Sequence, residues 1–136
     1  MTGSFALLPV IFSLIVLTWS SGFDIIYALQ DDDFDKSANL YSIPSLVGRK
    51  NALNISSLLH LITFAMVTFA GFYGHAGIIY WAGAAIFSGL LLYQHLIVKH
   101  DDLSRVNLAF GTTNGIASVI FAVFVISDLF LKNPIK

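Results

Sequence analysis

The sequence has no cysteine and no glutamate, and it carries little charge of either sign. The absence of cysteine excludes disulfides and thiolate metal sites. The absence of glutamate means that any carboxylate chemistry must use aspartate. Charged residues make up 11% of the 136 residues, below the roughly 25% of ordinary soluble domains, and the net charge of −1 gives no sign of nucleic-acid binding.

Apolar segments fill most of the chain, which is 57% hydrophobic. Several stretches have about the twenty residues that a helix needs to cross a hydrocarbon core of about 30 Å. Because backbone polar groups cannot stay unpaired in lipid, these spans must be helices. No signal peptide is evident. The predicted fold is an all-α, polytopic membrane helix bundle forming one domain over residues 1–136, with four spans at about 5–29, 53–72, 78–98 and 107–131.

Basic residues predict the orientation of these spans. Two of the connections between spans lie on the same side of the membrane, and they hold most of the lysine and arginine. The positive-inside rule therefore places these two connections in the cytoplasm and both termini outside. The basic residues of the two connections are Lys36, Arg49, Lys50, Lys99 and Arg105.

The stretch GFDIIYALQDDDFDKSA, residues 22–38, concentrates aspartate at the end of the first span. Asp24, Tyr27, Asp31 and Asp35 have the spacing that lines one face of a continuing helix. Carboxylates four residues apart repel each other unless a cation lies between them. Mg²⁺ prefers oxygen ligands and often binds one or two carboxylates together with substrate phosphates. The pair Asp31 and Asp35 is therefore a candidate Mg²⁺–diphosphate site.

This stretch has two other interpretations. The run can be a solvated helix end, and we expect Asp32 and Asp33 to be solvated in either case. An EF-hand calcium loop does not fit, because Lys36 stands where the loop needs glycine and Ser42 where it needs glutamate. Asp24 lies a turn or two inside the membrane end of the span, where an ionisable group usually faces a cavity or a partner.

The remaining polar residues of the spans have simpler interpretations. His60 and His95 are expected to be packed or interfacial, because no metal-ligand spacing accompanies them. Asn114 is expected to hydrogen-bond between helices, and small residues such as Gly83 and Gly89 suit close helix packing.

The stretch GFDIIYALQDDDFDKSANLYSIPSLVG resembles the second aspartate-rich motif of the UbiA-type membrane prenyltransferases. That motif reads D-x-x-Y-A-x-x-D-x-x-x-D and is followed by S-I/T-x-x-L/F-G. A later stretch, YQHLIVKHDDLSRVNLAFGTTNG, is most similar to the 4-hydroxybenzoate and related menaquinone-pathway branches of the family. The resemblance covers essentially the whole chain, but only the C-terminal half of a typical member. The residues that match the motif are Asp24, Tyr27, Ala28, Asp31, Asp35, Ser42, Ile43 and Gly48.

This resemblance implies a nine-helix bundle in which two aspartate-rich motifs face each other across a cavity, and this chain would supply the last four helices. Mg²⁺ held there binds the diphosphate of a polyprenyl donor, whose allylic carbon then alkylates an aromatic ring. By resemblance, Asp31 and Asp35 are catalytic Mg²⁺ ligands. Asp24 and Tyr27 line the substrate pocket, and Lys36 contacts the diphosphate.

The family's first motif, N-D-x-x-D-x-x-x-D, is absent from this sequence. We therefore expect the chain to be inactive alone and to need an N-terminal half as a partner. The expected substrates are a polyprenyl diphosphate and an aromatic acid, 4-hydroxybenzoate in quinone biosynthesis, and the expected location is the bacterial inner membrane. A menaquinone precursor is the alternative acceptor. A non-enzymatic membrane protein that binds Mg²⁺ or a lipid diphosphate is the alternative class.

Overall fold

The computed structural model describes residues 6–132, and within that range the chain is helical with short connections. This confirms the predicted all-α class. Phe5, where the first span was predicted to begin, lies outside the described residues. The elements are α1 (Leu7–Ala28), η1 (Leu29–Asp31), α2 (Asp32–Ser37), α3 (Ile43–Val47), α4 (Arg49–Tyr73), α5 (Ile78–Ile97), η2 (Leu108–Asn114) and α6 (Gly115–Lys132).

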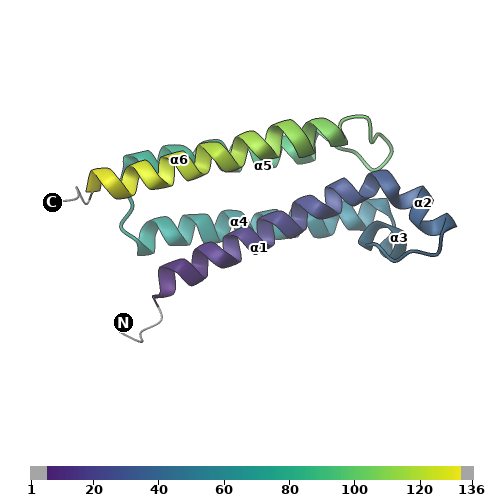
Figure 1. Ribbon diagram of the computed structural model, residues 1–136, viewed down its shortest axis with the longest axis horizontal. Helices are drawn as coiled ribbons and strands as arrows, with labels where there is room; N and C mark the ends of the chain where they lie inside the picture. Colours follow the sequence, from purple (N-terminus) through teal and green to yellow (C-terminus); the bar gives the residue numbers. More distant parts are fainter. Residues whose placement is uncertain (1–5, 133–136) are drawn as a thin grey trace.

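The long helices form two antiparallel pairs (Figure 1). Helix α1 packs along α4, and α5 packs along α6, whereas contact between α4 and α5 is much less extensive. Both ends of the described chain lie at one end of the molecule. The short helices α2 and α3 and the connection from α5 to η2 lie at the opposite end (Figure 1).

Three helical segments within residues 6–132 are long and apolar enough to cross a membrane: Leu7–Ser37, Arg49–Tyr73 and Leu108–Lys132. The remaining predicted span, at about 78–98, corresponds to α5, which has 20 residues. The polar residues Gln94 and His95 near its C-terminal end reduce its hydropathy, so this helix is not among the three. The lengths and positions of all four long helices otherwise follow the predicted spans.

Two apolar clusters fill the interior, one toward each end of the bundle. The cluster toward the termini joins all four long helices, with Ile15 from α1, Val67 from α4, Phe87 from α5 and Phe121 from α6. The rings of Phe87 and Phe121 are stacked with centroids 4.7 Å apart. The second cluster lies toward α2 and α3 and contains Ile25, Ile26, Leu29, Ala52, Val98, Val106 and Ala109.

The connection between the first two predicted spans, about residues 30–52, is not an extended loop. Most of it is helical. The backbone N–H of Ser45 donates to Ser42 Oγ and the N–H of Ser42 donates to Ser45 Oγ, so a reciprocal capping box begins α3. Gly48 then adopts φ +82°, a conformation that favours glycine, and α4 begins at the next residue.

A carboxylate caps α5 at the end of the bundle near the termini. Asp128 of α6 is buried, and its Oδ2 accepts a hydrogen bond from the Gly77 N–H at 2.8 Å. Its Oδ1 accepts from the Tyr80 N–H at 3.3 Å. Since the first N–H groups of a helix have no partner within the helix, this side chain ties the start of α5 to α6.

Close approach of α5 and α6 depends on glycine at residue 83. A Cβ added at Gly83 would overlap Cβ and Cγ of Phe124, which cannot move without moving α6. We expect Gly83→Ala to lower the free energy of unfolding by about 1–3 kcal/mol, the usual cost of overpacking. Gly89→Ala is the matched control on the same helix, because nothing lies within 4 Å of its added Cβ. Chemical unfolding in mild detergent measures both, and an equal effect of the two variants would contradict the proposed contact.

Candidate functional site

The aspartate stretch does not continue α1 as one uninterrupted α-helix. Asp24 and Tyr27 lie in the last turns of α1, Asp31 ends the 3₁₀ segment η1, and Asp35 lies in α2. A 3₁₀ residue turns about 120° instead of about 100°, so three such residues rotate the following side chains by about 60°. The single α-helical face predicted over all four residues is therefore interrupted by a 3₁₀ turn before Asp35.

Asp32 is the residue whose position differs most from expectation. It was predicted to be solvated, but its side chain is 0% exposed. Its Oδ2 accepts from Lys36 Nζ and from Arg49 Nε, each at 2.8 Å. Arg49 also pairs with Asp33, with Nη2 and Oδ1 2.7 Å apart, and Asp33 is 85% exposed as expected. Burial is possible because Arg49, 17 residues later at the start of α4, neutralises the Asp32 carboxylate.

This ion-paired group, Asp32 with Lys36, Arg49 and Asp33, fixes α2 against α4 and leaves two aspartates free. Within residues 6–132, neither Asp31 nor Asp35 forms an ion pair. Asp31 is exposed and Asp35 is half-buried. In the same range, no three or more His, Asp or Glu side chains gather closely enough to hold a metal by themselves. Among the described residues, therefore, protein side chains alone do not form a complete metal site.

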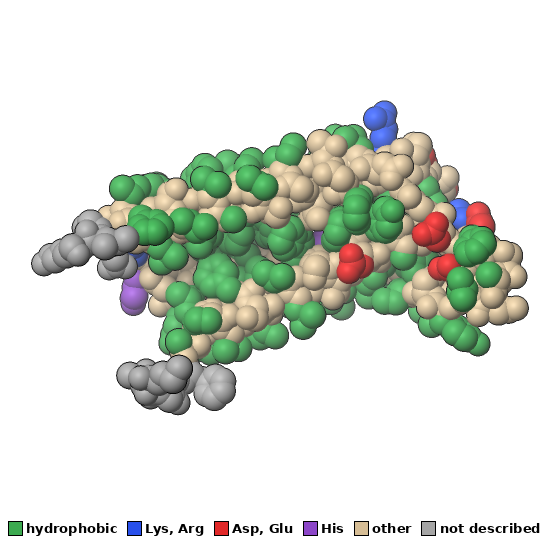
Figure 2. Space-filling view, in the orientation of Figure 1, with side chains coloured by type: hydrophobic (Ala, Val, Ile, Leu, Met, Phe, Trp, Pro, Cys, Tyr) green, Lys and Arg blue, Asp and Glu red, His purple; other side chains and the backbone are tan. Residues whose placement is uncertain are grey.

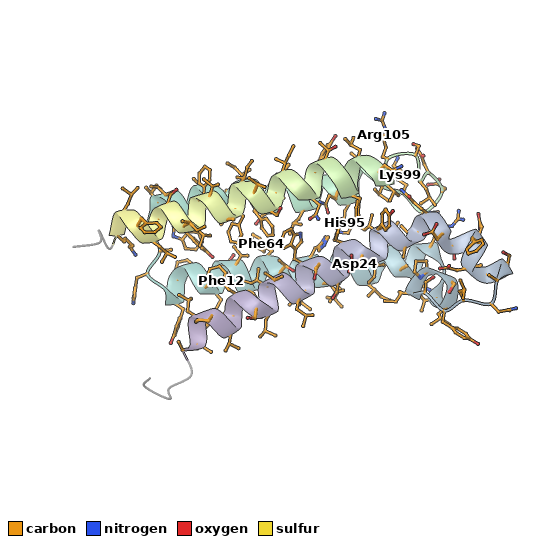
Figure 3. The ribbon with its side chains drawn as sticks, viewed as in Figure 1. Phe12, Asp24, Phe64, His95, Lys99 and Arg105 are labelled. Atoms are coloured by element: carbon orange, nitrogen blue, oxygen red, sulfur yellow. The ribbon has the colours of Figure 1, made fainter. Side chains whose placement is uncertain are left out.

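Asp24 lies beside a hollow at the junction of α1 and α3 (Figure 3). The hollow has a volume of about 290 Å³, and the side chain of Asp24 is exposed. This agrees with the expectation that an aspartate inside the end of a span faces an open space. The hollow is lined by Ser21, Asp24, Ile25, Ala28, Ile43 and Pro44.

The second family-like stretch meets the first at this end of the molecule. The Gln30 Nε2 group donates to Asn107 Oδ1 at 2.9 Å. The Tyr27 ring packs on the Phe110 ring with centroids 4.0 Å apart. The Phe23 ring also stacks on Phe110, with centroids 4.5 Å apart. Phe110 belongs to η2, which is π-helical, a form that often occurs at functional sites. Residues about 80 positions apart therefore form one continuous region.

Charged groups gather at the same end (Figure 2). Figure 3 shows Lys99 and Arg105 on the connection that precedes η2. Within this connection, hydrogen bonds from the side chain and backbone of Ser104 hold the pKa of Asp102 below its ordinary value. Asp102 therefore stays ionised at neutral pH and offers a negative charge between two cationic side chains.

Sequence reasoning missed several residues of this region. It did not single out Gln30, Phe110 or the burial of Asp32, because each depends on a contact with a distant segment. It also expected Asn114 to hydrogen-bond between helices, whereas Asn114 Oδ1 is buried without a partner among the described residues. The basic residues that follow the aspartates in the sequence were the feature from which ion pairs could have been predicted.

Comparison with known proteins identifies relatives over nearly the whole chain. A model described as the UbiA prenyltransferase family matches residues 1–127. The 4-hydroxybenzoate octaprenyltransferase of Nitrosomonas europaea is 30% identical over 129 residues, 95% of this chain and 44% of the relative. The protein of the same description from Chromohalobacter salexigens is 27% identical over 111 residues, 82% of this chain and 37% of the relative. The chain thus spans less than half the length of these relatives. No solved structure matches it.

Proposed function

Because the chain belongs to the UbiA prenyltransferase family, we propose that it supplies the second aspartate motif of a Mg²⁺-dependent aromatic prenyltransferase. Such an enzyme transfers a polyprenyl group from its diphosphate to an aromatic acceptor. The observation that carries the proposal is the meeting of the two family-like stretches, where Gln30 bonds Asn107 and Tyr27 packs on Phe110. Asp31 is the residue after Gln30, and among the described residues it forms no ion pair that would compete with a metal ion.

The donor set fits Mg²⁺ shared with a substrate. Asp31 and Asp35 provide carboxylate oxygens, which Mg²⁺ prefers, and both are free of cationic partners within the described range. Two carboxylates are too few for a site made by protein alone, but they suffice where phosphate oxygens and water complete the coordination. When bound, the ion supplies positive charge that stabilises a leaving diphosphate.

The other residues of the region would bind and shield the donor. The Lys36 ammonium has three donors and uses one on Asp32, so two remain for phosphate oxygens, and the side chain is 49% exposed. The rings of Phe23 and Tyr27 pack on Phe110, and aromatic side chains at this position would stabilise positive charge at an allylic carbon. Asp24 lines the same end of α1 and would contact the substrate at the adjacent hollow.

We infer 4-hydroxybenzoate as the acceptor and quinone biosynthesis as the pathway, because the relatives described above are named for that substrate. The alternative acceptor is a menaquinone precursor. The basic residues at the aspartate end support a cytoplasmic position for this end in a bacterial inner membrane. They are Lys36, Arg49, Lys50, Lys99 and Arg105.

The test is a prenyl-transfer assay in liposomes with Mg²⁺, a polyprenyl diphosphate and 4-hydroxybenzoate. The chain is assayed alone and together with the N-terminal half of a relative, such as the Nitrosomonas europaea protein. We expect product only from the pair and only with Mg²⁺, because one aspartate motif provides only part of the metal and diphosphate site. Product from the purified chain alone would contradict the need for a partner half.

A folded pair that gives no product with either 4-hydroxybenzoate or a menaquinone precursor would contradict the enzymatic proposal. Mg²⁺-dependent binding of the diphosphate without turnover would then favour a non-enzymatic binding protein. Folding of both parts is checked by helical circular dichroism and by co-purification.

A further inference from the structure

A second cavity lies in the seam between the two helix pairs, and its lining residues come only from α4 and α5. Its volume is about 410 Å³, within the range of small-molecule sites in proteins. Leu61, Phe64 and Leu92 form apolar walls, and small residues leave the space open. A Cβ added at Gly89, for example, would meet nothing within 4 Å. The cavity shares no lining residue with the hollow beside Asp24.

A chain of hydrogen bonds ends in this cavity. The His60 Nε2 group lies 3.2 Å from the carbonyl oxygen of Trp19, and His60 Nδ1 lies 2.8 Å from His95 Nε2. The His95 Nδ1 atom in turn lies 3.2 Å from Ser57 Oγ. His60 is 4% exposed, whereas Ser57 is exposed at the cavity. This series of hydrogen bonds therefore runs from the backbone of α1 to the cavity between α4 and α5. Figure 3 shows His95 between the two helix pairs.

The Trp19 carbonyl oxygen, at the buried end of this series, determines which atom donates in each hydrogen bond. A carbonyl oxygen only accepts, so His60 Nε2 must carry the hydrogen. A neutral His60 then accepts at Nδ1, so His95 Nε2 carries a hydrogen and donates it. A neutral His95 accepts at Nδ1, and Ser57 Oγ–H is the donor. With its only hydrogen committed, Ser57 Oγ offers the cavity lone pairs alone, and a ligand that bonds there must be a donor.

Polar groups at this depth of an apolar helix are costly, so their arrangement favours a binding role over chance. Ser57 and His60 lie inside the apolar segment Arg49–Tyr73, where an ionisable group is a functional-site hypothesis by default, and His95 lies in the last turn of α5. The rest of the cavity surface is apolar and partly aromatic, which suits a ring more than a charged or hydrated group. The site thus combines one acceptor with room and walls for an apolar ring.

We propose that this cavity binds a lipid-soluble phenol. The ligand's hydroxyl donates to Ser57 Oγ, its ring packs against Phe64 and the His95 imidazole, and its apolar tail extends along Leu61 and Leu92. This site does not rest on the proposed prenyl transfer, since it involves none of the aspartates of that site. Its occupant would be a membrane-resident aromatic alcohol that reaches the seam from the lipid phase.

The test measures ligand binding to the full chain in lipid nanodiscs by microscale thermophoresis. The probes are a phenol with a farnesyl chain, its methyl ether, and farnesol as an aliphatic alcohol. We expect the phenol to bind about two- to tenfold more tightly than its methyl ether, which is the usual worth of one net hydrogen bond. Farnesol is expected to bind more weakly than the phenol, because it lacks the ring.

Two variants connect binding to this cavity. Ser57→Ala should remove the preference for phenol over methyl ether, while Ser13→Ala, an exposed serine on α1, should leave it unchanged. Gly89→Leu should weaken phenol binding at least about tenfold by filling the ring's volume, while Ala82→Leu, exposed on the same helix outside the cavity, should not.

Three results would each overturn the proposal: no phenol binding by the folded chain, equal binding of phenol and methyl ether, or farnesol binding as tight as phenol. None of these results depends on catalysis, so the proposed prenyl transfer stands or falls separately.

Discussion

Replacing Asp31 or Asp35 by asparagine is expected to lower the rate of prenyl transfer at least about a hundredfold in the enzyme reconstituted from this chain and an N-terminal half. Asparagine has nearly the shape of aspartate but no charge, so the helix geometry is preserved and metal affinity falls. Both carboxylates are free of ion pairs among the described residues, so their loss leaves no unpaired cation in the fold. The effect should therefore appear in activity and not in stability.

The matched control is Asp101→Asn, because Asp101 is also exposed but lies on the connection before η2. It should retain activity within about twofold. If Asp31 and Asp35 bind Mg²⁺, the Mg²⁺ concentration that gives half the maximal rate should rise in both Asp31→Asn and Asp35→Asn. Full activity of Asp31→Asn at ordinary Mg²⁺ would remove that residue from the proposed metal site. A loss of activity that accompanies unfolding would instead assign it a structural role.

The sequence was sufficient to predict the long helices because their signal is local. Apolar length alone located the third span at 78–98, and α5 runs from Ile78 to Ile97. The fourth span was predicted over 107–131, and η2 with α6 covers Leu108–Lys132. Membrane-like segments must satisfy their own backbone hydrogen bonds, so their boundaries follow from composition. The π-helical start of the last span carries no comparable local signal.

The polar region between the first two spans was predicted less well because its structure depends on distant pairing. Counting charges indicated that cations lie near the aspartates, but not that Arg49 would bury Asp32. The spacing predicted one continuous α-helix, whereas a 3₁₀ turn covers Leu29–Asp31 and the buried aspartate is Asp32. Side-chain contacts between segments, such as Gln30 with Asn107, have no periodicity to reveal them.

The histidine pair was undervalued for a related reason. His60 and His95 are 35 residues apart and have no metal-ligand spacing, so packing was the reasonable expectation for each. Only the antiparallel arrangement of α1, α4 and α5 brings them together with Ser57 and the Trp19 carbonyl. The chemistry of the pair is therefore a property of the fold, and its directionality follows from a backbone carbonyl that sequence patterns do not identify.

Arg49→Met is expected to lower the free energy of unfolding of the chain by about 2–3 kcal/mol, somewhat below the usual cost of breaking a fully buried pair, because Arg49 is 29% exposed. Asp32 Oδ1 already has no hydrogen-bond partner among the described residues, and Oδ2 would keep only Lys36. With Lys36 as its one remaining partner, the Asp32 carboxylate would recover less of the free energy that its burial costs. Lys50→Met, an exposed neighbour, is the control and should change stability by less than about 0.5 kcal/mol.

The double variant Asp32→Leu/Arg49→Met separates a buried charge from a lost contact. If the cost of Arg49→Met comes from stranding the Asp32 charge, removing that charge as well should recover much of the lost stability. Unfolding in detergent, followed by circular dichroism, measures all four proteins of the cycle. Additive losses would mean that the two side chains act independently, and the ion pair would then not be what holds α2 against α4. Recovered stability without recovered prenyl transfer in the reconstituted pair would show that the ion pair also orients Asp31 and Asp35.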